Sequence, residues 1–234
     1  MSILRLIVAP ALMLIASCGL APAQDAPVDL HAPAPKAKPS KDAKPAAPAP
    51  KQAISAVEAV RRANAWLESA QVLNADFVQI GPDGHRAEGK LSVERPGRMR
   101  FQFAPPDRLE IVADGRSVAV RDQKMDTQDL YLIAQTPLKF LLADHIDLAK
   151  DTEVLRVETN ENDVSILIED KATLGGSAQI ELIFDPATFA LRQWTVNDAQ
   201  GFQTVVTLFN VDLTAKPDEA LFKIDEQRMI GVKH

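Results

Sequence analysis

The strongest constraint on the fold is a period-two alternation of apolar and polar residues that begins near residue 72 and recurs to about residue 213. Successive side chains of a β-strand point to opposite faces, so this alternation predicts strands with one apolar face. Turn signals such as Pro82-Asp83-Gly84 and Asp114-Gly115 separate the segments. Because no helical segment follows each strand, the pattern favours a large curved antiparallel sheet or a barrel over a parallel α/β sheet.

Two segments have helical character instead. Ser55, with Glu58 three residues later, forms a capping box, and apolar residues recur at helical spacing after it. Thr136-Pro137 opens a second, short helical segment over residues 138–143, where Pro suits the first helical position. The expected fold class is therefore mainly β with helices (α+β).

The C-terminal segment completes this domain. Residues 216–220 should form one helical turn, and residues 221–224 a short last strand. We therefore predict a single folded domain over residues 53–234.

The N-terminus predicts export. Residues 1–23 have a positive start at Arg5 and an apolar stretch over residues 6–16, too short to span a bilayer. The expected location is the periplasm of a Gram-negative type of cell envelope. Residues 24–52 are rich in Ala, Pro and Lys, and should form an extended spacer because they cannot bury enough apolar surface to fold.

Two processing sites compete within this signal. Ala21-Pro22-Ala23 fits the small-x-small rule, with cleavage before Gln24. Ile15-Ala16-Ser17-Cys18 fits a bacterial lipobox, in which Cys18 is a candidate lipidation site. An acylated Cys18 would tether the domain to a membrane, whereas cleavage before Gln24 would release it.

The composition offers little support for catalysis or nucleic-acid binding. The net charge is −6 and no basic stripe is present, which argues against a nucleic-acid partner. The four histidines lack metal-ligand spacing, and the only cysteine, Cys18, lies in the signal. No nucleophile elbow or phosphate-binding loop occurs. We expect no enzyme activity, no metal site and no cofactor.

An ordered set of short motifs runs through the predicted domain. In chain order these are Phe77-Val78-Gln79, Gly89-Lys90-Leu91, Arg95-Pro96-Gly97-Arg98-Met99-Arg100-Phe101, Pro105-Pro106, Asp114-Gly115-Arg116-Ser117, Pro137-Leu138-Lys139-Phe140-Leu141-Leu142 and Ala215-Lys216-Pro217-Asp218-Glu219-Ala220-Leu221-Phe222. The set resembles the LolA family over residues 55–229. Phe101 stands where the family usually has tryptophan, and the spacer before the domain is longer than typical.

The resemblance implies a half-open antiparallel β-barrel with helices covering the concave face. Soluble members of the family take acylated lipoproteins from an inner-membrane ATP-driven transporter. They deliver them to an outer-membrane receptor, which is itself a lipoprotein of the same fold. A monomer is expected.

The inward strand faces suit acyl chains, which gain about 0.8 kcal/mol for each CH₂ removed from water. The predicted cavity residues are Phe77, Leu91, Val93, Met99, Phe101, Phe103, Leu109 and Ile111. The same residues could equally form a packed core, because any barrel interior needs filling. The carrier hypothesis expects a mostly vacant groove.

A lid and a latch complete this hypothesis. The resemblance makes Pro137, Leu138, Phe140, Leu141 and Leu142 the lid, although an ordinary capping helix would look similar. The family's functional arginine corresponds to Arg95, which strand parity places inward with Leu91 and Val93. A buried guanidinium needs acceptors, and carbonyls at the end of the lid helix would serve. The alternative is that Arg95 lies in a solvated turn.

Four functions remain open on the sequence. The first is a soluble carrier of lipoproteins, and the second is a membrane-anchored receptor of LolB type that uses Cys18 as its anchor. The third is a periplasmic hydrolase, which would need convergent titratable groups in the groove. The fourth is a sensor domain of similar fold that binds a peptide by strand addition.

Overall fold

The computed structural model describes residues 54–225 except 138 and 174, and every structural statement here concerns those residues. The predicted signal, Cys18 and the spacer lie outside the described residues, as does Leu138 of the predicted lid.

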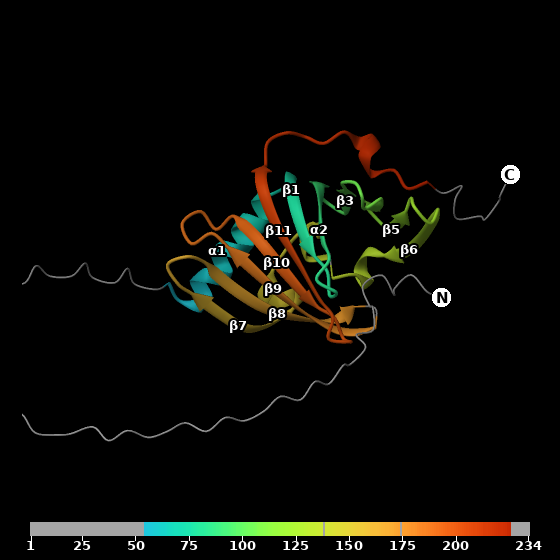
Figure 1. The fold of residues 1–234 in the computed structure, drawn as a ribbon. Helices are drawn as coiled ribbons and strands as arrows, with labels where there is room; N and C mark the ends of the chain where they lie inside the picture. The colour runs from blue at the N-terminus through green and yellow to red at the C-terminus, as the bar shows by residue number, and fades with distance from the viewer. Residues whose placement is uncertain (1–53, 138, 174, 226–234) are drawn as a thin grey trace, which may run out of the picture. The chain divides into compact units, whose positions relative to one another are not determined.

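About half of the described residues belong to one antiparallel sheet of eleven strands (Figure 1). Its strands are β1 (Val72–Ile80), β2 (Arg86–Glu94), β3 (Arg98–Phe103), β4 (Leu109–Asp114), β5 (Ser117–Asp122), β6 (Thr127–Leu132), β7 (Glu153–Thr159), β8 (Val164–Thr173), β9 (Gly176–Phe184), β10 (Leu191–Asn197) and β11 (Gln203–Asp212). The spatial order is β6-β5-β4-β3-β2-β1-β11-β10-β9-β8-β7. Two consecutive meanders, β1–β6 and β7–β11, are thus joined where β1 pairs with β11.

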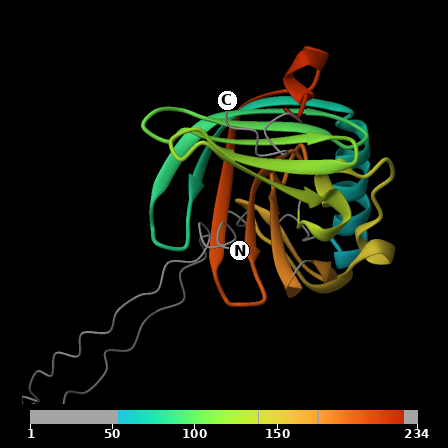
Figure 2. The same ribbon diagram turned by 90° about the vertical axis from the view of Figure 1, so that its right-hand side faces the viewer.

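The sheet is strongly curved and is not closed. Figure 2 shows the sheet bending so that the two meanders form arms around a concave side. The strands β6 and β7 end the strand order and do not pair with each other in the described chain. The predicted half-open antiparallel barrel is therefore confirmed.

The helices are few and short. They are α1 (Ala56–Ser69), α2 (Lys139–Leu142), α3 (Leu148–Asp151) and the 3₁₀ turns η2 (Ile133–Gln135) and η3 (Glu219–Phe222). The Ser55 hydroxyl accepts a hydrogen bond from the Glu58 amide at 3.2 Å, as the capping signal predicts. No helix in the described ranges is long and apolar enough to cross a membrane.

The core lies on the concave side, between the sheet and α1, α2 and α3. The small residues Ala59 and Ala63, with Leu67, form the buried stripe of α1. On β1 the alternate residues Leu73, Ala75 and Phe77 are buried, while their neighbours are half-buried or exposed. Burial of these alternate positions is what the period-two pattern predicts.

The close approach of β2 and β3 requires glycine at position 89. Gly89 pairs with Phe77 on one side and with Phe103 on the other. A Cβ at this position would lie 2.1 Å from the carbonyl oxygen of Gln102, which no real side chain could tolerate. This close approach of the β3 backbone explains why the motif Gly89-Lys90-Leu91 begins with glycine.

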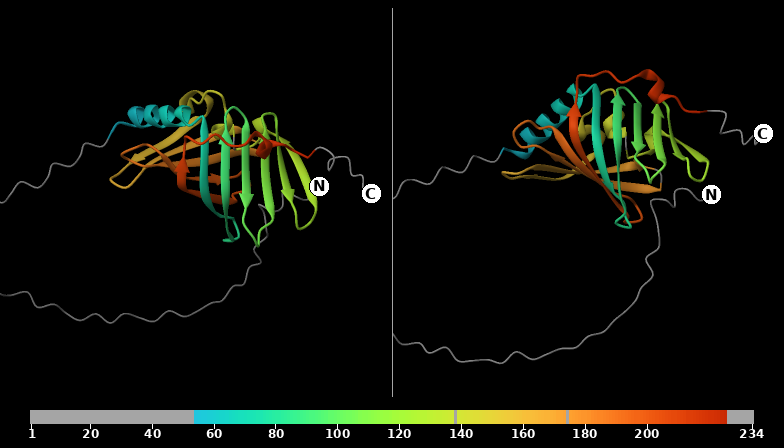
Figure 3. Two further views of the ribbon diagram at one scale, coloured as in Figure 1. Left: turned by 90° about the horizontal axis from the view of Figure 1, so that it is seen from above. Right: turned by 45° about the horizontal axis from the view of Figure 1, so that its top comes forward.

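The predicted last strand over residues 221–224 is wrong. Leu221 and Phe222 belong to η3, and the segment after β11 crosses the convex face of the first arm (Figure 3). The Arg100 guanidinium donates to the Leu221 carbonyl at 3.3 Å, and the Phe222 side chain is buried beneath Arg98. Side-chain contacts to the convex face, and not ladder pairing, hold this segment.

Candidate functional site: the concave face and its lid

The predicted cavity residues gather on the concave face of β1–β4. Six of the eight are at most 7% exposed, and the two on β4, Leu109 and Ile111, are half-buried against the same cluster. The buried six are Phe77, Leu91, Val93, Met99, Phe101 and Phe103. The Phe77 ring meets the rings of Phe101 and Phe103 edge-on, each with ring centres 5.0 Å apart.

The second arm contributes an equally apolar surface that sequence reasoning did not assign to the site. Its largest buried side chain is Trp194 of β10. The Trp194 ring lies 6.2 Å from Phe101 of the first arm and 6.2 Å from Phe140 of the lid, measured between ring centres. The two arms and the lid therefore meet at Trp194. The alternation of Trp194 and Val196 was the available signal, although a register shift between Leu191 and Gln193 breaks the strict period of this strand.

The predicted lid, α2, packs with α1 and α3 against the concave face. Phe140, Leu141 and Leu142 are 6%, 4% and 2% exposed, and Pro137 is half-buried. Burying each such side chain is worth about 1.5–3 kcal/mol. In the described residues the chain's own side chains occupy the groove, in place of the vacant groove that the carrier hypothesis expects.

Two polar contacts attach this lid to the sheet. The Gly97 amide in the β2–β3 turn donates to the Leu142 carbonyl at 2.9 Å. On the other side, the Lys139 ammonium pairs with the Asp170 carboxylate of β8 at 2.8 Å. Asp170 is only 3% exposed, so the charge on Lys139 offsets part of the free energy of burying that carboxylate.

The β2–β3 turn needs glycine to reach the lid. Gly97 has φ +76°, and a Cβ there would lie 2.6 Å from the Cα of Gly115. The Gly115 amide donates in turn to the Gly97 carbonyl at 3.0 Å, which fixes the turn against the β4–β5 hairpin. A residue with a side chain would displace the donor that bonds Leu142.

Arg95 lies in this turn, directly after the end of β2, and is buried at 7% exposure. Its Nε and Nη1 atoms have no hydrogen-bond partner in the described chain, and the turn reaches the lid through Gly97. Burial lowers the pKa of the Arg95 guanidinium to about 10, while the charge of Glu68 on α1 acts in the opposite direction. The guanidinium stays charged at neutral pH and retains unused donors.

Residues 54–225, without 138 and 174, contain no group of three or more His, Cys, Asp or Glu side chains arranged to hold a metal ion.

Comparison with known proteins identifies the family. The profile described as "Outer membrane lipoprotein carrier protein LolA" matches residues 68–225, more than half of the chain. The chain belongs to the LolA family. The family resemblance predicted from the ordered motifs is therefore confirmed, and membership of a family of carriers agrees with the expectation that the chain is not an enzyme.

Individual LolA relatives are distant. An "Outer-membrane lipoprotein carrier protein" of Pseudomonas paraeruginosa is 26% identical over 185 residues, which is 71% of this chain and 83% of the relative. The protein of the same name from Azotobacter vinelandii is 25% identical over 178 residues, 70% of this chain and 82% of the relative. A solved LolA superfamily structure from Nitrosomonas europaea aligns with a TM-score of 0.42 at 12% identity, over 74% of this chain and 99% of that one.

The buried ion pair of the lid gives a testable prediction. Asp170→Asn should accelerate hydrogen exchange of the amides at residues 140–143 by about tenfold, because a charge-assisted hydrogen bond contributes about 1.5–3 kcal/mol and Lys139 is partly exposed. Glu153→Gln, which breaks the exposed Lys171–Glu153 pair on the same arm, is the control and should leave these amides unchanged. Equal exchange in both variants would show that the ion pair does not hold the lid.

Proposed function

We propose that this protein carries the acyl chains of lipoproteins on its concave face and moves them through the periplasm from the inner to the outer membrane. One observation carries the proposal: a continuous apolar surface spans both arms of the sheet, and where the arms meet at Trp194 it is covered by α2, a helix of only four residues. Its relatives are named outer-membrane lipoprotein carrier proteins, which supports the same function. The partners would be an inner-membrane ATP-driven transporter and an outer-membrane receptor.

Loading would exchange one set of apolar contacts for another. Acyl chains leaving water gain about 0.8 kcal/mol for each CH₂, and they would displace the lid side chains from the groove. The lid side chains lose their own burial in that exchange, so the net free energy of loading is smaller than the chains alone would provide. A modest net value suits a carrier that must also release its cargo.

The open edge of the sheet supplies the route for this exchange. Because β6 and β7 do not pair in the described chain, the two arms could separate without breaking ladder hydrogen bonds. We propose that the lid and the arms form a two-state element that the cargo biases toward the open form.

The lid residue Phe140 tests this equilibrium. Phe140→Ala should lower the free energy of unfolding by about 3 kcal/mol, yet tighten binding of a synthetic triacylated lipopeptide. Binding tightens because the apparent affinity is limited by the fraction of molecules in the open state. Urea unfolding and titration followed by tryptophan fluorescence measure the two quantities.

Phe189→Ala is the matched control for this variant. Phe189 is 4% exposed and packs against Phe184 with ring centres 6.3 Å apart, so its loss should destabilise the fold without affecting the lid. If both variants bind the lipopeptide as wild type does, cargo binding does not depend on lid opening.

We propose that Arg95 acts as a latch that restrains the lid. It would act through the β2–β3 turn, which contacts the lid at Gly97. Arg95→Leu should raise the free energy of unfolding by about 1 kcal/mol or more, because it removes a buried guanidinium with unpaired donors. If Arg95 also restrains the lid, the variant should load the lipopeptide several-fold faster in stopped-flow mixing. Arg116→Leu, at an exposed hairpin position, is the control. Unchanged loading and release in Arg95→Leu would remove the latch from the mechanism.

The lipobox sequence favours a second candidate, a membrane-anchored receptor of the same fold. Both candidates use the domain boundaries proposed from the sequence, with a signal over residues 1–23 and a spacer over residues 24–52. Mass spectrometry of the mature protein separates them. A diacylglyceryl group on Cys18 identifies the receptor, whereas an unmodified N-terminus at Gln24 identifies the soluble carrier.

A further inference from the structure

The inward face of the edge strand β6 is polar, unlike the inward faces of the neighbouring strands. Thr127, Asp129 and Tyr131 alternate along β6 and therefore share one face. We call these three residues the polar rim. The strand register places them on the concave side, because Tyr131 is opposite Val118, which is opposite the buried Ala113.

One row of paired residues changes from apolar to polar side chains across the first arm. It runs from Phe101 on β3 through Ile111 on β4 and Val120 on β5 to Asp129 on β6. Its inner end is a buried aromatic ring in contact with Phe77 and Trp194. Its outer end is a carboxylate at the open edge of the sheet. A ligand lying along this row would have its chain inside and its polar end at Asp129.

The polar rim has unused hydrogen-bonding capacity. Asp129 Oδ2 and Thr127 Oγ1 are both shielded from solvent, and neither has a hydrogen-bond partner in the described chain. Burial, and then the negative charge of Asp129, raise the pKa of Tyr131, so its hydroxyl remains protonated and able to donate. Buried polar atoms without partners are uncommon in folded proteins and require an explanation.

The chain continues from the polar rim directly into the lid. β6 ends at Leu132, η2 follows over Ile133–Gln135, and α2 begins at Lys139. An acyl chain that displaces α2 from the groove would therefore emerge next to β6.

We propose that the polar rim binds the polar linkages of an acylated N-terminal cysteine and selects it over anionic phospholipids. In this subsite the Asp129 carboxylate accepts from an amide N–H of the cargo. The Thr127 and Tyr131 hydroxyls donate to carbonyl oxygens of its ester or amide groups. This inference rests on the proposed function and specifies which acylated molecule the groove takes.

The chemistry of the two ligand classes supports this selection. An N-acylated, S-diacylglyceryl cysteine offers amide N–H donors and carries no charge at this position, so it satisfies a carboxylate. A phosphatidylglycerol has similar chains and ester carbonyls but no N–H, and its phosphate would be repelled by Asp129. Because the two lipids have similar chains, the apolar groove would not distinguish them, and only the rim would.

The test measures dissociation constants of two probes with the full mature chain. One probe is a synthetic lipopeptide with N-palmitoyl and S-diacylglyceryl groups on its cysteine, and the other is short-chain phosphatidylglycerol below its micelle concentration. Asp129→Asn keeps the size of the side chain and removes its charge. We expect it to tighten binding of the phospholipid and weaken binding of the lipopeptide, so that the selectivity ratio falls about tenfold.

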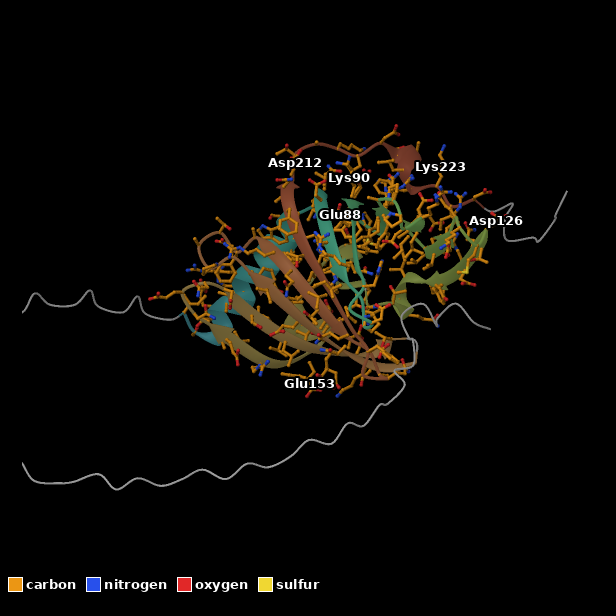
Figure 4. The ribbon with its side chains drawn as sticks, in the orientation of Figure 1. Glu88, Lys90, Asp126, Glu153, Asp212 and Lys223 are labelled. Atoms are coloured by element: carbon orange, nitrogen blue, oxygen red, sulfur yellow. The ribbon has the colours of Figure 1, made fainter. Side chains whose placement is uncertain are left out.

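Two further variants make the result specific. Glu161→Gln removes one negative charge from the exposed β7–β8 turn and should leave the ratio unchanged. Tyr131→Phe removes only a donor to carbonyl groups, which both probes possess, so it should weaken both and leave the ratio near the wild-type value. The control lies beside β7, whereas the polar rim lies on β6, and these strands stand at opposite ends of the strand order. Figure 4 shows Glu153 of β7 far in the view from Asp126, which directly precedes β6.

The outcomes separate this inference from the proposed function. Wild-type binding of the lipopeptide with an unchanged ratio in Asp129→Asn would overturn the polar rim and leave the carrier function intact. Failure of the wild-type chain to bind the lipopeptide would overturn the carrier function and the polar rim together.

Discussion

The pairing of β1 with β11 is the contact on which the rest of this structure depends. It joins residues that are far apart in the chain, such as Phe77 and Leu208, and it makes one sheet out of two meanders. Every other strand pair links neighbours in sequence. Without this junction neither arm could face the other, and the apolar surfaces that meet at Trp194 would have no common concave side.

In the proposed carrier function, the lid and the cargo would compete for that concave side. In the described chain α2 provides three buried apolar side chains, one backbone hydrogen bond to Gly97 and one ion pair to Asp170. These contacts are few enough for an acyl chain to replace them, since a handful of CH₂ groups gains a similar free energy. If the free energies of burying the lid side chains and of burying the acyl chains differ only slightly, the same groove could load at one membrane and unload at another.

Strand periodicity predicted most of the fold and six of the buried concave residues, because a period of two fixes which face a side chain takes. It could not predict the Lys139–Asp170 pair, whose partners are 31 residues apart and belong to a lid and a distant strand. It also failed at residues 221–224, where side-chain contacts to the convex face override local strand propensity. For Arg95, parity predicted burial but not the absence of acceptors around Nε and Nη1.

The unpaired edges β6 and β7 have a consequence for solubility. An exposed strand edge is a template on which a second chain can add, and a groove that opens at its edges would increase that danger. β7 carries Glu153, Arg156 and Glu158 with solvent-exposed side chains, and Arg156 pairs with Glu158 at 3.4 Å. A copy of the same strand approaching this edge would have to desolvate those charges. If the groove opens to lipid between β6 and β7, as the proposed function requires, these charges would disfavour strand addition by another molecule of the same protein.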